Sequence, residues 1–140
     1  MTRAFDFDAI VVGDNLPPLS KPPIDRVQLA LFAGASGDHN PIHLDDAAAR
    51  AAGLPGVIAH GMLSMAFLGQ FVADWAPRGG LRSFAARFTA MAYPGDTITC
   101  RGTVVKKAVI DGRKTVELDI VAENQAGERT LAGSASVVFA

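Results

Sequence analysis

The fold is decided by one uninterrupted apolar stretch, residues 62–75, which reads Met62-Leu63-Ser64-Met65-Ala66-Phe67-Leu68-Gly69-Gln70-Phe71-Val72-Ala73-Asp74-Trp75. It contains no proline, and its apolar residues fall on nearly every face of a helix rather than on one stripe. A helix of this kind is normally buried, and Pro77 marks where it must end. The stretch therefore predicts a long buried helix near the middle of the chain.

Downstream of this helix the apolar residues change to a period of two. Four segments rich in Val, Thr, Ile and Phe follow this pattern, namely residues 81–91, 97–110, 114–122 and 129–139. Turn sequences separate them, namely Pro94-Gly95-Asp96, Asp111-Gly112 and residues 124–127. The pattern predicts an α+β fold in which four strands form an antiparallel meander that buries one face against the helix.

Upstream of the helix the chain is rich in proline and then in helix caps. Four prolines within residues 16–23 exclude this segment from the interior of a sheet, so it is an extended edge or a connection. Asp25 can cap a short apolar helix that fades at Gly34. Asp45 can cap a second helix over residues 46–51, where Asp46 and Arg50 form an i,i+4 pair and Gly53 is the stop.

Composition bounds the class of protein. The 140 residues are 49% hydrophobic and 19% charged, and no repeat or linker divides them, so residues 1–140 are expected to form one domain. A net charge of -1 gives no electrostatic footprint for nucleic acid or an anionic membrane surface. The single cysteine, Cys100, fits a reducing compartment, and no apolar leader or 18-residue uncharged run is present, so a cytoplasmic protein is expected.

The densest group of polar residues spans residues 36–46, between the two short helices. Pro41 restricts the loop and Gly37 permits a sharp exit from the preceding helix, so Asp38 and His43 can be held close together. A carboxylate and an imidazole within reach of one water form a proton-transfer pair. The alternative is that Asp38 and Asn40 only close turns while His43 is a buried, hydrogen-bonded side chain.

His60-Gly61 lies immediately before the apolar helix. The first amides of a helix have no partners within it, so the Gly61 N–H can bind a developing oxyanion. The alternative is that Gly61 only permits helix entry and that His60 supports neighbouring residues of the site or packs.

Other chemistries find less support in the sequence. Asp38, His39, His43 and His60 are potential metal ligands, but they do not follow a known ligand spacing, so no metal site is predicted. Cys100 in a strand and Ser64 in the buried helix are expected to pack or, for the hydroxyl, to bond to the backbone rather than act as nucleophiles.

Two linked motifs resemble those of the MaoC-like, (R)-specific enoyl-CoA hydratase family. They read Ser36-Gly37-Asp38-His39-Asn40-Pro41-Ile42-His43 and Ile58-Ala59-His60-Gly61-Met62-Leu63, and Arg87-Phe88 followed by Pro94-Gly95-Asp96 is a third similarity. The resemblance implies a hotdog fold, in which an antiparallel sheet wraps a long helix, here about residues 61–75. It also implies homodimers or larger assemblies, with the active site near the subunit interface.

The activity that the resemblance implies is reversible addition of water to a trans-2-enoyl thioester, giving the (R)-3-hydroxyacyl thioester without metal or redox cofactor. Asp38 and His43 match the catalytic pair of the family, and Gly61 matches the glycine whose amide binds the thioester carbonyl. Asn40 is expected to hold the loop on the substrate-binding side. The spacing i, i+3, i+4, i+7 gives one helical stripe that lines an acyl pocket or simply packs in the core, namely Met65, Leu68, Gly69 and Val72.

Two further functions stay open at this point. A hotdog thioesterase would cleave the acyl thioester instead of hydrating it. Alternatively, the chain is the catalytic subunit of a heteromeric dehydratase, because it keeps both Asp38 and His43. The sequence does not distinguish acyl chain lengths, or coenzyme A from acyl-carrier-protein thioesters.

Overall fold

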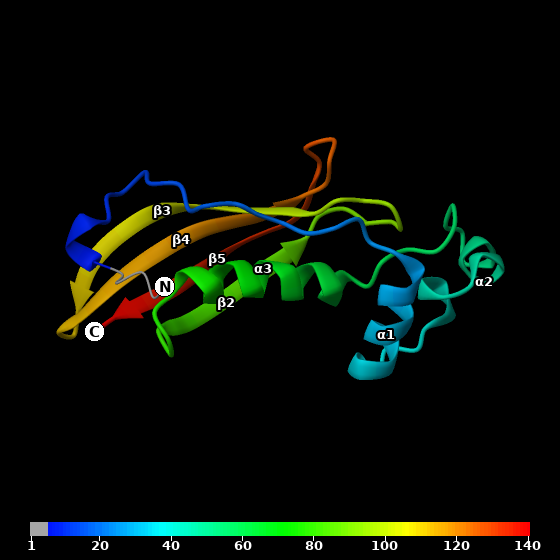
Figure 1. The fold of residues 1–140 in the computed structure, drawn as a ribbon, viewed down its shortest axis with the longest axis horizontal. Helices are drawn as coiled ribbons and strands as arrows, with labels where there is room; N and C mark the ends of the chain where they lie inside the picture. Colours follow the sequence, from blue (N-terminus) through cyan, green and yellow to red (C-terminus); the bar gives the residue numbers. More distant parts are fainter. Residues whose placement is uncertain (1–5) are drawn as a thin grey trace.

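The computed structural model describes residues 6–140, in which a curled antiparallel sheet wraps one long helix (Figure 1). The helix, α3, spans Gly61–Trp75, as expected. The sheet has the order β1-β3-β4-β5-β2, and its strands are β1 (Leu19–Ser20), β2 (Leu81–Phe88), β3 (Thr99–Ile110), β4 (Arg113–Glu123) and β5 (Arg129–Phe139). This is the predicted α+β hotdog architecture.

Helix α3 supplies the centre of the core. Leu68 and Val72 are completely buried, and Phe67 and Phe71 nearly so, against inward-facing residues of the sheet such as Val104 and Leu118. Burial of such side chains provides most of the driving force for folding, at about 1.5–3 kcal/mol each. The helix is not buried on every side as the sequence suggested, since the residues on one side are exposed to solvent, namely Met62, Ala66, Gln70 and Ala73.

The meander prediction is right for β3, β4 and β5. Asp111 and Gly112 connect β3 to β4 with positive φ angles of 51° and 73°, the conformation of a type I′ hairpin turn. The predicted and observed strands differ by no more than three residues at either end, and β5 has the predicted bounds. Buried residues alternate with more exposed ones over residues 99–104 of β3 and 116–123 of β4, which is why a period of two was visible in the sequence.

The prediction was wrong about the position of β2. This strand pairs with β5, not with β3, so residues 89–98 cross to the other side of the sheet instead of forming a hairpin. Backbone groups of this connection form hydrogen bonds with other segments. Ala92 O accepts from Ala59 N, Asp96 O accepts from Ile24 N, and Gly95 N donates to Ile24 O. The predicted turn residues Gly95 and Asp96 therefore bond to a segment about 70 residues earlier in the chain instead of closing a hairpin.

The proline-rich segment forms an edge of the sheet, which is one of the two roles predicted for it. Strand β1 pairs with β3 in the register Leu19 to Cys100, and Asn15 makes a further bridge to Thr103. None of the helices formed by residues 6–140 is long and apolar enough to cross a membrane.

Helices α1 (Arg26–Ser36) and α2 (Asp46–Ala51) lie together at one end of the sheet (Figure 1). Their predicted caps are present, since Asp25 accepts from Gln28 N and Asp45 from Ala47 N. Helix α1 continues past Gly34 to end at Gly37, whose φ is +79°.

Asp46 forms its ion pair with a more distant residue than the predicted partner Arg50, whose charge acts on it only electrostatically. Asp46 forms an ion pair of 2.8 Å with Arg26 and accepts a hydrogen bond from Val57 N. The backbone hydrogen bond and then Arg26 lower the pKa of Asp46 below its usual 3.8. Asp46 therefore connects α2 to α1 and to the loop that precedes α3.

Candidate active site

A short 3-10 helix, η2 (Pro41–His43), organises the polar loop between α1 and α2. Asn40 Oδ1 accepts a hydrogen bond from Ile42 N at 3.2 Å, and Asp38 Oδ1 accepts one from Asn40 N at 3.3 Å. This helical turn was not predicted from the sequence, although proline is common at the first position of a helix, as Pro41 is here. Asn40 thus holds the loop, and the turn brings Asp38 and His43 to the same side.

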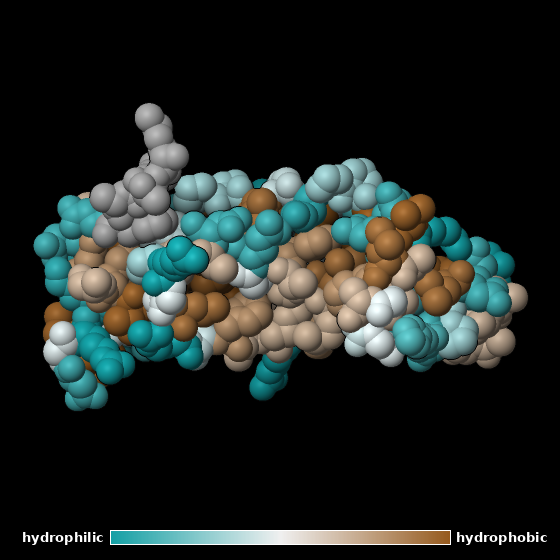
Figure 2. Space-filling model, turned by 60° about the horizontal axis from the view of Figure 1, so that its bottom comes forward, coloured by the Kyte–Doolittle hydropathy of each residue, from teal (hydrophilic) through white to brown (hydrophobic). Residues whose placement is uncertain are grey.

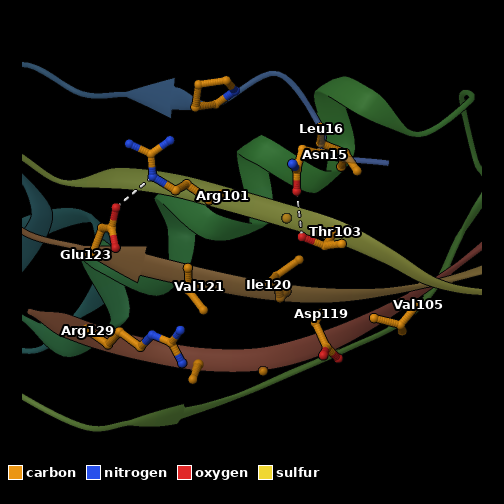
Figure 3. A pocket seen from close by; sticks show the side chains of 14 residues that line it. Asn15, Leu16, Arg101, Thr103, Val105, Asp119, Ile120, Val121, Glu123 and Arg129 are labelled. Atoms are coloured by element: carbon orange, nitrogen blue, oxygen red, sulfur yellow. Dashed lines mark hydrogen bonds and ion pairs between the residues drawn. The ribbon is translucent and has the colours of Figure 1, made fainter. Parts of the chain in front are cut away.

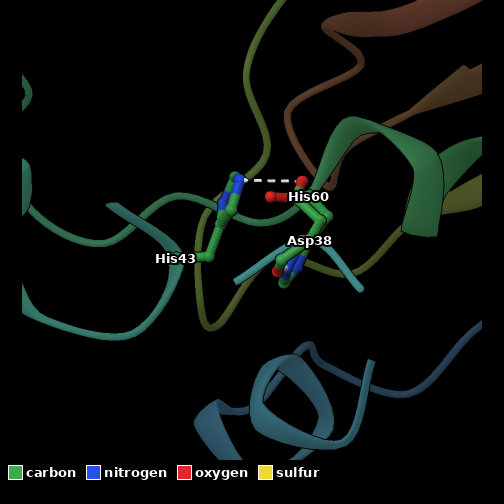
Figure 4. Close-up of side chains that lie close together, drawn as sticks. All are labelled: Asp38, His43 and His60. Atoms are coloured by element: carbon green, nitrogen blue, oxygen red, sulfur yellow. Dashed lines mark hydrogen bonds and ion pairs between the residues drawn. The ribbon is translucent and has the colours of Figure 1, made fainter. Parts of the chain in front are cut away.

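Asp38 and His43 face each other in the structure (Figure 4). His43 Nε2 lies 3.5 Å from Asp38 Oδ2, and the side chain of His43 is 8% exposed while that of Asp38 is 51% exposed. The other ring nitrogen, His43 Nδ1, donates to the carbonyl of Ile58 at 2.8 Å. Because a carbonyl only accepts, the Nδ1 hydrogen is fixed there, and Nε2 is left to exchange a proton with Asp38 or with a bound molecule.

His60 supports this pair from behind. His60 is 1% exposed, and its ring stacks on His43 with a centroid distance of 3.9 Å. The rings of His60 and Phe32 pack edge to face, with a centroid distance of 4.8 Å. His60 Nε2 donates to the backbone carbonyl of Asp38 at 3.2 Å. Burial lowers the pKa of His60 below its usual 6.5, although the hydrogen bond to Asp38 opposes this shift. A neutral ring is therefore favoured next to His43.

From the sequence, His60 was expected to mark the helix entry and either to support neighbouring site residues or to pack. The structure shows that it contacts both members of the pair, His43 through its ring and Asp38 through the backbone. The concentration of all three histidines within 22 residues was the available signal. The third, His39, is exposed and lies outside the cluster.

The three clustered side chains also merit a test as metal ligands, since one ligand atom from each of Asp38, His43 and His60 lies within 4.8 Å of the others. The rings of His43 and His60 are stacked at an interplanar angle of only 23°. Imidazole lone pairs lie in the ring plane, so the lone pairs of these two rings lie in nearly parallel, stacked planes and do not converge well on one ion. The arrangement fits proton transfer better than metal binding.

A small cavity of about 190 Å³ lies beside His43, which lines it, whereas Asp38 does not. Its walls also include His60, Gly61 and Ser64, together with Phe88 and part of the connection after β2. Gly61 is the first residue of α3, where backbone N–H groups lack partners within the helix. A Cβ at Gly61 would lie 2.8 Å from Cε1 of Phe88, so only glycine allows the ring to approach the helix this closely.

The predicted acyl-binding stripe does not line this cavity. Leu68 and Val72 are fully buried core residues, and Met65 is partly buried against the core. Gly69 lies next to Phe84, since a Cβ at Gly69 would be 3.7 Å from Cε1 of the Phe84 ring. Core packing, the alternative from the sequence, describes Leu68 and Val72, and the binding role of the stripe stays a prediction.

Cys100 is completely buried in β3, where burial raises the pKa of its thiol to about 12. A thiol with such a pKa is protonated at neutral pH and is not a nucleophile. The expectation that Cys100 packs rather than reacts is confirmed.

A larger hollow of about 850 Å³ lies on the outer face of the sheet, away from α3 (Figure 3). Its polar side chains bond mainly to one another, as in the Arg101–Glu123 ion pair of 2.6 Å and the Thr103–Asn15 hydrogen bond of 2.9 Å. It does not include Asp38 or His43.

Solved structures share this arrangement of helix and sheet. The chain is 32% identical to the R-hydratase PhaJ1 of Pseudomonas aeruginosa, with a TM-score of 0.79 over 94% of this chain and 83% of that one. It is 27% identical to the (R)-hydratase of A. caviae involved in PHA biosynthesis, with a TM-score of 0.80 over 92% of this chain and 96% of that one.

Among curated proteins, the chain is 36% identical over 127 residues to the fatty acid synthase subunit beta of Aspergillus oryzae. The match covers 89% of this chain but spans only 6% of the length of that protein. Enoyl-CoA hydratase ChsH3 of Mycobacterium tuberculosis is 36% identical over 75 residues, which are 51% of this chain and 26% of that protein. The model of the MaoC-like domain matches residues 11–126. The chain therefore belongs to the MaoC-like dehydratase family.

Proposed function

We propose that the protein is an (R)-specific enoyl-thioester hydratase, which adds water reversibly to the double bond of a trans-2-enoyl thioester. The observation that carries this proposal is the Asp38–His43 pair, whose histidine lines a cavity that Gly61, the first residue of α3, also lines. Similarity to two R-hydratases and to an enoyl-CoA hydratase supports it.

The reaction requires two proton transfers, for which the pair supplies two groups. As the oxygen of water bonds to the β-carbon, one group accepts a proton from that water, and the other gives a proton to the α-carbon. The two groups therefore enter the reaction with one proton between them, on His43 Nε2 or on Asp38. The Gly61 N–H, at the positive end of the helix dipole, would donate to the thioester oxygen, which gains charge as the enolate forms.

No step of this mechanism needs a metal or a redox cofactor, and we propose that the enzyme uses neither. The near-parallel stacking of His43 and His60 supports this part of the proposal, because it gives a poor set of ligands for one ion. A cytoplasmic location is likewise a proposal, supported by the lone cysteine, Cys100.

The proposal is tested by adding purified protein to a panel of trans-2-enoyl-CoA esters and following the loss of the enoyl-thioester absorbance. Chiral analysis of the product should give the (R)-3-hydroxyacyl ester. Asp38→Asn and His43→Ala should each lower kcat by about 10²–10⁴-fold, the usual contribution of a general acid or base. His39→Ala is the matched control, because His39 is exposed and outside the cluster, and it should keep full activity.

Two results would overturn the assignment. Full turnover in Asp38→Asn or His43→Ala would remove the pair from the mechanism. Release of free thiol, with no hydrated product, would identify the protein as a thioesterase instead.

The second part of the proposal is a homodimer formed through β2 and α3. Strand β2 pairs with β5 on one side, and no strand within residues 6–140 pairs with its other edge. Exposed apolar residues lie close by, since Met62 is 56% and Phe88 53% exposed. Figure 2 shows broad apolar areas on the side of the molecule where α3 and β2 lie. A second copy of the chain would cover both the unpaired edge of β2 and these exposed apolar residues.

A heteromer with a related subunit is the second candidate. The ChsH1-ChsH2 complex of Mycobacterium tuberculosis contains a chain that is 26% identical to this one, with a TM-score of 0.78 over 93% of this chain. Light scattering on the pure protein should give the mass of a dimer, with activity. An inactive pure protein that gains activity from a co-expressed relative would favour the heteromer.

A further inference from the structure

Ser64 has an unusual environment for a serine in a helix. It is only 2% exposed, and its Oγ has no hydrogen-bond partner. Within residues 6–140, the only other buried side-chain polar atom in this state is His60 Nδ1. From the sequence, Ser64 was expected to pack or to bond its hydroxyl to the backbone, the usual solution in helices; the residue is buried, but the backbone bond is absent.

The position of Ser64 relates this hydroxyl to the proposed reaction. Ser64 follows Gly61 by three residues on α3, so the two residues lie on the same face of the helix. Both line the cavity of about 190 Å³ that His43 also borders. An unpartnered hydroxyl in the wall of a cavity is a hydrogen-bonding group available to whatever enters it.

Of the two unpartnered atoms, Ser64 Oγ carries a hydrogen that it can donate, whereas His60 Nδ1 does not when the ring is neutral. His60 donates its Nε2 hydrogen to the carbonyl of Asp38, so a neutral His60 has only a lone pair at Nδ1. This atom cannot donate to a carbonyl oxygen. The Oγ–H of Ser64 is therefore the unengaged side-chain donor of the two.

We infer that Ser64 Oγ–H donates a hydrogen bond to the thioester carbonyl oxygen of the substrate, beside the Gly61 N–H. This inference rests on the proposed function and extends its donor set from one group to two. A donor that is buried and unpaired before substrate binds needs no reorganisation during the reaction, which is the condition for strong stabilisation of a developing oxyanion. In the free protein the same unpaired hydroxyl reduces stability.

Ser64→Ala tests the inference through two effects of opposite sign. The variant should raise Tm, because it removes a buried hydroxyl without a partner. It should lower kcat for enoyl-CoA hydration by about 10²-fold, the lower end of the usual loss of one oxyanion donor. Ser64→Thr keeps a hydroxyl at this position and should retain most of the activity.

Thr130→Val is the matched control for the stability effect. Thr130 is 1% exposed and lines the same cavity, but its Oγ1 donates to the carbonyl of Ala122 at 3.2 Å. Removing a hydroxyl that already has a partner should lower Tm, in contrast to Ser64→Ala.

A direct measurement uses butanoyl-CoA labelled with ¹³C at the carbonyl, a saturated thioester that the enzyme cannot hydrate. Difference infrared spectroscopy should show that binding to the wild type lowers the carbonyl stretching frequency and that Ser64→Ala reduces this shift. An unchanged shift together with unchanged kcat would overturn the inference, as would a lower Tm with unchanged kcat, which would indicate a structural hydroxyl.

The infrared measurement also separates this inference from the proposed function. A wild type that binds butanoyl-CoA with a Ser64-dependent shift, yet hydrates no enoyl-CoA, would support the donor and refute the hydratase. A wild type that shows no carbonyl shift would refute the donor, whatever its activity.

Discussion

Replacing His43 by alanine should weaken the fold as well as stop the proposed reaction. The side chain is 8% exposed, and it makes two contacts that alanine cannot make. One is the hydrogen bond from Nδ1 to the carbonyl of Ile58 at 2.8 Å, and the other is the stacking on His60 at 3.9 Å. Both contacts belong to the free protein and do not depend on substrate.

The size of the effect follows from these contacts. A buried carbonyl left without its partner costs about 1–3 kcal/mol, and a stacked pair of rings contributes about 0.5–1.5 kcal/mol beyond its buried area. The free energy of unfolding should therefore fall by about 1.5–4.5 kcal/mol. For a chain of 140 residues this corresponds to a decrease in Tm of roughly 5–15 °C.

Asp38→Asn provides the contrast that makes this prediction specific. Its side chain is 51% exposed, and asparagine keeps an oxygen that can accept from Asn40 N. Its stability should change by less than about 0.5 kcal/mol, as at most surface positions. Both variants should lose hydratase activity, but only His43→Ala should lose stability, as measured by thermal and urea unfolding. A His43→Ala protein as stable as the wild type would refute the energetic account of the site.

Three further predictions concern the neighbouring residues. Gly61→Ala should lower Tm and activity because the new methyl group displaces the Phe88 ring, and a second change, Phe88→Leu, should restore part of the Tm. Burial lowers the pKa of His60, so the unfolded chain binds the proton more strongly than the folded one does. Stability should therefore be unaffected by this group above about pH 6.5 and fall as the pH drops below it, and urea unfolding at several pH values should show a smaller loss in His60→Gln. Cys100 should resist alkylation at pH 8 in the native protein and react once urea unfolds it, and rapid labelling of the native protein would contradict its burial.

Local features of the fold were well predicted from the sequence. The apolar stretch gave α3 within one residue at its start, and Asp111-Gly112 gave the hairpin because few residues other than glycine, asparagine and aspartate adopt positive φ readily. The caps Asp25 and Asp45 were found because their partners lie two or three residues away.

Features that depend on distant residues were not predicted. The pattern of residues 81–91 indicated a strand, but a period of two does not specify which strand lies next to it, and β2 joined β5. Asp46 bonds to Arg26, twenty residues earlier, instead of to the nearby Arg50.

The same division holds within the candidate site. Asp38, His43 and Gly61 were named from their motifs. The stacking of His60 on His43 and the unpartnered Oγ of Ser64 depend on side-chain positions that only the folded chain defines.

The connection between β2 and β3 determines how the cavity can open. Its backbone bonds at one point to Ala59, next to His60, and at two others to Ile24, just before α1. Ala92 and Met91 of the same connection form part of the cavity wall. Moving this connection away from the cavity would break backbone hydrogen bonds to the segment before α3 and to the entry of α1. The wall of the cavity is therefore tied to the segments that position both helices.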